Sequence, residues 1–167
     1  MSRIRQIDCF PIKLARDFEA AKGTAGSPHA LSGAGEYRWS AHFPALYSMQ
    51  FETAMVRVQL DNGLTGWGEA QAPLAPEVPA EIVRRLLAPA LVGGEFHGGR
   101  DEMDRCWWRM YSTMRVRGQT GGFMLDAISG VDLALWDLAG QIAGLPVAKL
   151  IAGGAARAAV PAYVSGI

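Results

Sequence analysis

The sequence predicts an α+β fold in which a three-stranded antiparallel sheet is followed by a helical bundle. Near the amino terminus, successive side chains alternate between two faces with the period of a β-strand. A second alternating segment runs into the hairpin sequence Asp61-Asn62-Gly63, and a third segment follows the turn directly. After Pro76 the apolar residues change to helical spacing, which continues with interruptions as far as Ile151.

The three expected strands cover residues 3–15, 54–60 and 64–70. In the first strand, Phe10, Ile12 and Leu14 fall on one face. Pro11 has no amide hydrogen to donate, so we expect it at an edge of the sheet. Asn62 and Gly63 tolerate positive φ, which favours a tight turn between the second and third strands.

Three helices and a shorter fourth one are expected after the sheet. The first has Pro79 in its first turn and kinks or ends near Pro89. The second starts near Gly99, the third runs from about Gly122 to Ala143, and Gly144 stops the third helix. The fourth opens at Pro146 and runs through Ile151. The buried stripes of the first three helices are expected to be Ile82, Val83, Leu86, Leu87, Ala90 and Leu91; Met103, Trp107, Met110 and Met114; and Ile128, Val131, Leu135, Leu138 and Ile142.

Two segments do not fit a simple α+β unit. Residues 18–50 show no convincing periodicity, and a connection of that length is usually functional or disordered. Residues 159–164 have the composition of one further strand. A lone strand has unpaired backbone groups, so we expect this strand to begin a second domain.

Composition narrows the class of protein. Half of the 167 residues are apolar, which is enough for a core, and 16 basic residues balance 16 acidic ones. Because the sequence has no run of like charges long enough to attract phosphates or an anionic membrane, it predicts neither nucleic acid nor a membrane as a partner. Cys9 and Cys106 are too few for a disulfide framework, which predicts a reducing cytoplasm. No signal-peptide core and no membrane-spanning run is recognisable.

One stretch of the third helix carries a specific motif, Gly130-Val131-Asp132-Leu133-Ala134-Leu135-Trp136-Asp137-Leu138-Ala139-Gly140, which continues through Gly144-Leu145-Pro146-Val147. It is joined by Gly66-Trp67-Gly68-Glu69-Ala70 after the hairpin, by Arg117-Gly118, and by Gly153-Gly154 before Val160-Pro161-Ala162-Tyr163. Together these residues resemble the mandelate racemase and muconate-lactonizing group of the enolase superfamily. The resemblance covers nearly the whole chain except residues 18–50.

The resemblance implies a two-domain enzyme in which an α+β cap closes over a modified β/α barrel. Residues 1–152 would form the amino-terminal capping domain, and residues 153–167 the linker and the first strand of the barrel. In that group a base removes the proton α to a substrate carboxylate, and Mg²⁺ held by three barrel carboxylates stabilises the enediolate. The catalytic and metal-binding residues would all lie beyond Ile167, so none is assigned to this chain.

The resemblance therefore predicts the capping, specificity-determining portion of a sugar-acid dehydratase, inactive on its own and homo-oligomeric when intact. Racemase or epimerase, cycloisomerase and a naturally short, non-catalytic binding module remain as alternatives. The substrate-binding candidates are the cationic, polar and aromatic members of residues 18–50: Lys22, His29, Tyr37, Arg38, Trp39, His42 and Tyr47.

Two other sets of residues are expected to be structural. Trp67, Trp107, Trp108 and Trp136 lie on elements with clear core stripes, which favours packing over ligand stacking. Asp126, Asp132 and Asp137 are separated by six and five residues, so they point to different faces of a helix and form no metal site. We expect Asp132 and Asp137 to act at caps or contacts.

Overall fold

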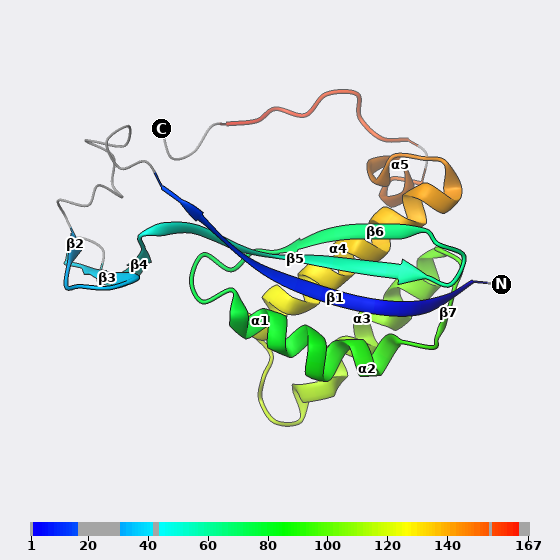
Figure 1. The fold of residues 1–167 in the computed structure, drawn as a ribbon. Coiled ribbons are helices and arrows are strands. Elements are labelled where there is room, and N and C mark those ends of the chain that lie inside the picture. Colours follow the sequence, from blue (N-terminus) through cyan, green and yellow to red (C-terminus); the bar gives the residue numbers. More distant parts are fainter. Residues whose placement is uncertain (1, 17–30, 42–43, 154, 164–167) are drawn as a thin grey trace.

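The computed structural model describes residues 2–16, 31–41, 44–153 and 155–163. Its main sheet has the order β6-β5-β1-β7 and contains the three predicted strands, which are β1 (Ser2–Ala15), β5 (Gln50–Leu60) and β6 (Thr65–Ala70). The short β7 (Glu95–Phe96) was not predicted and pairs only with Ser2 and Arg3. The helices cover one face of this sheet (Figure 1), which confirms the α+β prediction.

The edge position of Pro11 and the hairpin are both as predicted. Pro11 pairs with Ala54 of β5, and β7 does not reach that far along the other side of β1. At the hairpin, the Leu60 amide donates to the Leu64 carbonyl (2.9 Å), and Gly63 has φ +91°. Phe10 and Leu14 lie on the outer face of the sheet, 40% and 59% exposed, because the helices cover the opposite face.

The first predicted helix is one continuous helical segment with a change of pitch in its middle. It consists of α1 (Glu77–Ile82), a π-helical segment η2 (Val83–Leu87) and α2 (Ala88–Leu91). Pro89 cannot donate a hydrogen bond to the preceding turn, which explains why the π-type turn immediately precedes it. The helical segment therefore continues past Pro89 to Leu91, with a changed hydrogen-bond pattern before the proline. Pro79 lies in the first turn, as predicted.

The remaining helices agree closely with the sequence. They are α3 (Arg100–Arg115) with Gly99 at its N-cap, α4 (Phe123–Ala143) with Gly144 as a left-handed C-cap, and α5 (Val147–Ile151) after Pro146. Met103 and Met110 of α3 are buried, and so are Ile128, Val131, Leu135 and Leu138 of α4. Among the described residues, no helix is both long and apolar enough to cross a bilayer.

Glycines let α4 lie directly on β6, which explains part of the motif. A Cβ on Gly68 would lie 2.2 Å from the Gly130 carbonyl oxygen, and one on Gly66 would lie 2.2 Å from that of Ala134. A Cβ on Gly130 would in turn meet the Ala70 amide at 2.8 Å. Only glycine permits this backbone approach. It is reinforced by Asp137, whose Oδ2 accepts a hydrogen bond from the Trp67 amide (2.9 Å), in line with its expected structural role.

Three predictions about packing and strands are wrong. Trp67 and Trp108 are 45% and 53% exposed, because one lies on the outer sheet face and the other on the solvent side of α3, while Ile142 is 41% exposed. Trp107 and Trp136 do pack against the core. Residues 159–163 form no strand, since no strand of the described chain lies beside them to supply hydrogen bonds; Val164 lies outside the described residues.

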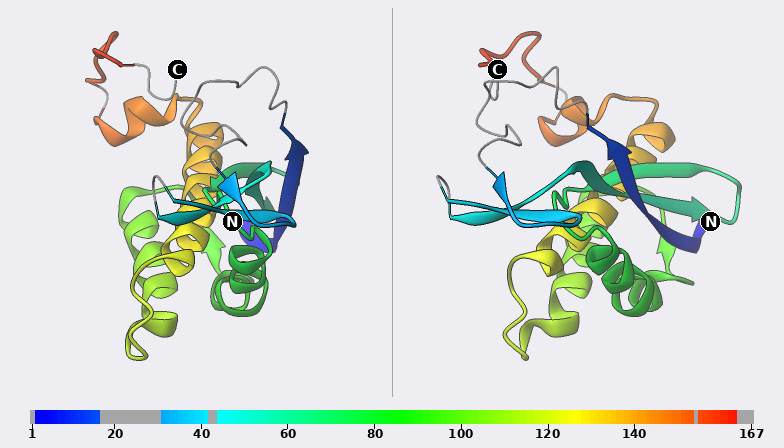
Figure 2. Two further views of the ribbon diagram at one scale, coloured as in Figure 1. Left: turned by 90° about the vertical axis from the view of Figure 1, so that its left-hand side faces the viewer. Right: turned by 60° about the vertical axis from the view of Figure 1, so that its left-hand side comes forward.

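The segment expected to be a loop without structure contains a second sheet. Its order is β2-β3-β4, formed by β2 (Leu31–Ser32), β3 (Tyr37–Ser40) and β4 (Ala45–Ser48). We call β2–β4 the small sheet. Figures 1 and 2 show that it extends from one end of the main sheet, beyond the helices.

Candidate functional site

The small sheet positions four of the seven predicted substrate-binding residues. Its register pairs Arg38 with Tyr47 and Trp39 with Leu46. Because side chains alternate along a strand, Tyr37 and Trp39 share one face of β3 and Arg38 lies on the other, beside Tyr47. The sheet therefore separates the candidates into two groups. Lys22, His29 and His42 lie outside the described residues.

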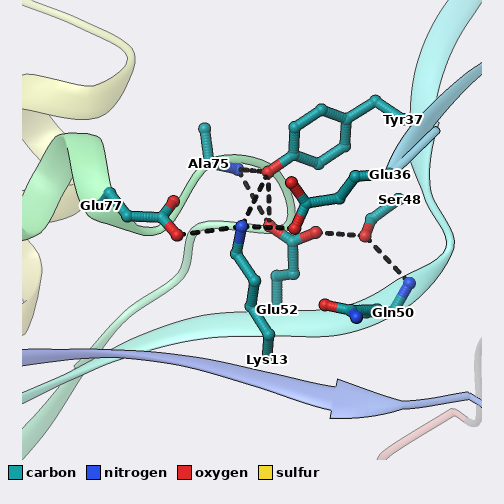
Figure 3. A network of polar contacts seen from close by, with 8 residues as sticks. All are labelled: Lys13, Glu36, Tyr37, Ser48, Gln50, Glu52, Ala75 and Glu77. Atoms are coloured by element: carbon teal, nitrogen blue, oxygen red, sulfur yellow. Dashed lines mark hydrogen bonds and ion pairs between the residues drawn. The ribbon is translucent and has the colours of Figure 1, made fainter.

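Tyr37 points into a polar cluster at the base of the small sheet (Figure 3). Its hydroxyl donates to Glu52 Oε2 (3.0 Å) and accepts from the Ala75 amide (3.0 Å). The same Ala75 amide also reaches Glu52 Oε2 (3.0 Å). Burial raises the pKa of Tyr37, so the hydroxyl keeps the proton that it donates. Tyr37 thus joins β3 to β5 and to the segment before α1.

Lys13 is the cation of this cluster, and its neighbours come from two segments, the start of β3 and the start of α1. Its Nζ contacts Glu36 Oε1, which precedes β3, and Glu77 Oε1 of α1 at 2.9 Å. It also lies 3.4 Å from the Tyr37 hydroxyl. Hydrogen bonds to Glu36 and then to Glu77 raise the pKa of Lys13 above its ordinary value, so the ammonium stays charged. We call Lys13, Glu36, Tyr37, Glu52 and Glu77 the Lys13 cluster.

Sequence reasoning missed Lys13, Glu36, Glu52 and Glu77. A signal for two of them exists, because Lys13 and Glu52 occupy positions of β1 and β5 on the face that carries Val56 and the other buried side chains. Opposite charges paired on the inner face of a sheet indicate a specific contact. Their contacts with the segment that forms the small sheet could not be predicted, since the small sheet itself was not.

A cavity of about 380 Å³ opens beside the cluster, between β4, the start of β5 and the segment after β6. Arg16, Tyr47, Gln50, Phe51 and Leu74 are among its lining residues. The Arg16 guanidinium lies over the Phe51 ring, 4.9 Å from its centroid. The cavity thus combines a cation, an amide and aromatic surfaces, which suits a small polar molecule with apolar edges.

Two buried polar atoms of the described chain lack a hydrogen-bond partner, and both belong to this region. They are Arg38 Nε in the small sheet and Gln50 Oε1 at the cavity. Buried polar atoms are nearly always paired in folded proteins. Gln50 therefore brings unused hydrogen-bonding capacity to the lining of the cavity, and Arg38 brings it to the small sheet.

The described residues do not fit a magnesium site. Nowhere in the described chain do three or more His, Cys, Asp or Glu side chains converge in a way that could hold a metal ion. The carboxylates of Glu36 and Glu77 instead face the Lys13 ammonium. No metal chemistry is therefore assigned to this region.

Comparison with known proteins identifies the group. Residues 37–152 match the sequence profile of the mandelate racemase / muconate lactonizing enzyme N-terminal domain. A D-galactonate dehydratase family member from Paenibacillus sp. (strain JDR-2) is 43% identical over 110 residues, which are 65% of this chain and 25% of that protein. The D-galactarolactone cycloisomerase of Agrobacterium fabrum is 33% identical over 148 residues, 87% of this chain and 35% of that protein.

Solved structures of similar fold belong to the same superfamily. A member of the enolase superfamily from Agrobacterium tumefaciens superposes with a TM-score of 0.73 at 29% identity, covering 90% of this chain and 37% of that one. A protein of the mandelate racemase/muconate-lactonizing type from Roseovarius nubinhibens, 28% identical, was solved with magnesium. The chain spans 25% and 35% of the lengths of the two curated relatives described above. The chain belongs to the mandelate racemase / muconate lactonizing enzyme family of the enolase superfamily, and it corresponds to the N-terminal domain of these proteins.

Proposed function

We propose that this chain is the capping and substrate-specificity part of a magnesium-dependent enolase-superfamily enzyme that removes the proton α to a carboxylate. The reaction we favour is dehydration of a sugar acid. The observation that carries this choice is the 43% identity to a D-galactonate dehydratase family member. Cycloisomerisation is the second candidate, since the D-galactarolactone cycloisomerase matches 87% of the chain.

The role of the cap in this proposal is to bind and cover the part of the substrate remote from the reacting carbon. A lid of this kind excludes water and selects among substrates. The small sheet supplies an exposed aromatic ring at Trp39, 47% exposed, and cationic and hydroxyl donors at Arg38 and Tyr47.

Other components of the proposal lie outside these residues. Magnesium polarises a substrate oxygen when bound, and the described residues offer no ligand set for it, so a barrel domain of the same enzyme is proposed to hold the ion and the base. Self-association and a cytoplasmic location remain predictions.

Substrate profiling of a longer form of the protein that continues beyond Ile167 tests the proposal. Replacing Trp39 by alanine removes an exposed ring of the small sheet, so we expect the ratio of kcat/KM between two sugar acids to change by about tenfold. Trp108→Ala is the matched control, because Trp108 is also exposed but lies on α3. An unchanged substrate preference in Trp39→Ala would contradict the capping role of the small sheet.

A further inference from the structure

The small sheet has no backbone ladder to the main sheet among the described residues. Its three strands pair only with one another, and the main sheet has its own separate order. β4 ends at Ser48 and β5 begins at Gln50, so the chain passes from one sheet to the other within two residues. Between the described residues of the two sheets, side-chain contacts therefore help to set the angle between the sheets.

Those contacts converge on the Lys13 cluster, as Figure 3 shows. Lys13 of β1 reaches Glu36, which directly precedes β3, and Glu77 at the start of α1. Tyr37 reaches Glu52 of β5. The cluster therefore connects the small sheet to both layers of the body, the main sheet and the helices.

The last strand of the small sheet, β4, is also hydrogen-bonded to the Glu52 carboxylate. Ser48 Oγ donates to Glu52 Oε1, and the Gln50 amide donates to Ser48 Oγ at 2.9 Å. Ser48 is buried, with 6% of its surface exposed. The two oxygens of Glu52 thus hold β3 and β4 separately, one through Tyr37 and the other through Ser48.

A backbone outlier lies at the same point. Ala75 has φ +51°, a left-handed conformation that it alone adopts among the non-glycine residues of the described chain. Its amide donates to both Tyr37 Oη and Glu52 Oε2. A strained conformation persists where surrounding contacts determine it, and such residues gather at functional sites.

We propose that Lys13 is a positioning residue that fixes the angle of the small sheet, and through it the placement of Trp39 and Arg38, an inference that rests on the proposed capping function. Lys13 lies on β1 and touches neither Trp39 nor Arg38; it acts through Glu36 and Tyr37. Without its charge, Glu36 and Glu77 lose their shared cation and face each other across the space that the ammonium occupied. Like charges at close range repel, so the small sheet would turn away from α1.

Hydrogen–deuterium exchange of the 167-residue chain tests this inference without any substrate, so its outcome is independent of whether the proposed activity exists. Lys13→Met keeps the length of the side chain and removes the charge. We expect amides of β3 and β4 to exchange about tenfold faster in this variant, while those of Ala54–Leu60 in β5 keep their wild-type rates. Lys13→Arg restores a cation and should restore slow exchange.

Arg84→Met is the matched control, because it removes the same charge and breaks an ion pair with Glu81 on α1, at a site that is 58% exposed. We expect wild-type exchange throughout β3 and β4 in this variant. Equal exchange of β3 and β4 in wild type and Lys13→Met would overturn the proposal. So would equally accelerated exchange in both sheets, which would mean that Lys13 supports the whole fold rather than the angle of the small sheet.

Discussion

Lys13 and Glu77 show how a single contact depends on protonation. The hydrogen bond from Lys13 lowers the pKa of the Glu77 carboxyl below its ordinary value of 4.5. A carboxyl whose pKa is depressed in the folded state stabilises that state above its unfolded pKa, and this contribution disappears as the pH falls through the folded value. Glu36 and Tyr37 face Lys13 from the small sheet, and Glu77 faces it from α1.

The difference in unfolding free energy between wild type and Lys13→Met should therefore be constant above about pH 4.5 and shrink as the pH falls below it. Urea unfolding of both proteins at a series of pH values measures this difference. Arg84→Met serves again as the comparison for loss of a positive charge. A difference that grows on acidification would show that Lys13 does not stabilise the ionised form of Glu77.

At the scale of elements, the contact between β6 and α4 depends on the absence of side chains. Gly68→Ala would place a Cβ 2.2 Å from the Gly130 carbonyl oxygen and 2.6 Å from the Ala134 amide. These neighbours are backbone atoms of a helix, so they cannot turn aside as a flexible side chain can.

We expect Gly68→Ala to destabilise the chain by about 3 kcal/mol or more, through overpacking. The matched variant is Gly121→Ala, because an added Cβ there meets nothing within 4 Å. Thermal unfolding of both variants gives the comparison. Equal stability of Gly68→Ala and wild type would mean that β6 and α4 are not in direct backbone contact.

The main elements could be predicted because each has a local cause. The turn at Asn62 and Gly63, the left-handed cap at Gly144 and the helix start at Pro146 each follow from the chemistry of one or two residues. The exposure of Trp67 and Trp108 could not be predicted, since it depends on which face of the sheet or helix another element covers. Phe10 and Leu14 show the same limit, because alternation identifies two faces of a strand without saying which is buried.

The small sheet could not be predicted for a related reason. Strands of two to four residues are too short for periodicity to emerge, and this sheet is held by Lys13 and Glu52 from distant parts of the sequence. The candidate residues Tyr37, Arg38, Trp39 and Tyr47 were found by chemical type alone. Their division between two faces, with Tyr37 engaged in the Lys13 cluster, required the register of β3 and β4.

At the scale of the whole molecule, the chain combines a closed core with an extended small sheet. The main sheet and α1 to α4 bury one continuous apolar cluster. The small sheet lies beyond this core and carries the exposed ring of Trp39 and the unpaired Arg38 Nε, and a cavity lies beside its strand β4. In the proposed cap, the core would support the small sheet, and the small sheet would select and shield the substrate.

We propose that this chain caps an active site whose chemistry lies in another part of the enzyme. The most direct measurement is turnover of D-galactonate and related sugar acids with added Mg²⁺, comparing the 167-residue chain with a longer form that continues beyond Ile167. If the chain acts as a cap, we expect the longer form to dehydrate at least one sugar acid and the 167-residue chain to dehydrate no sugar acid. Turnover by the 167-residue chain alone would contradict it, because the chemistry would then belong to residues described here as structural.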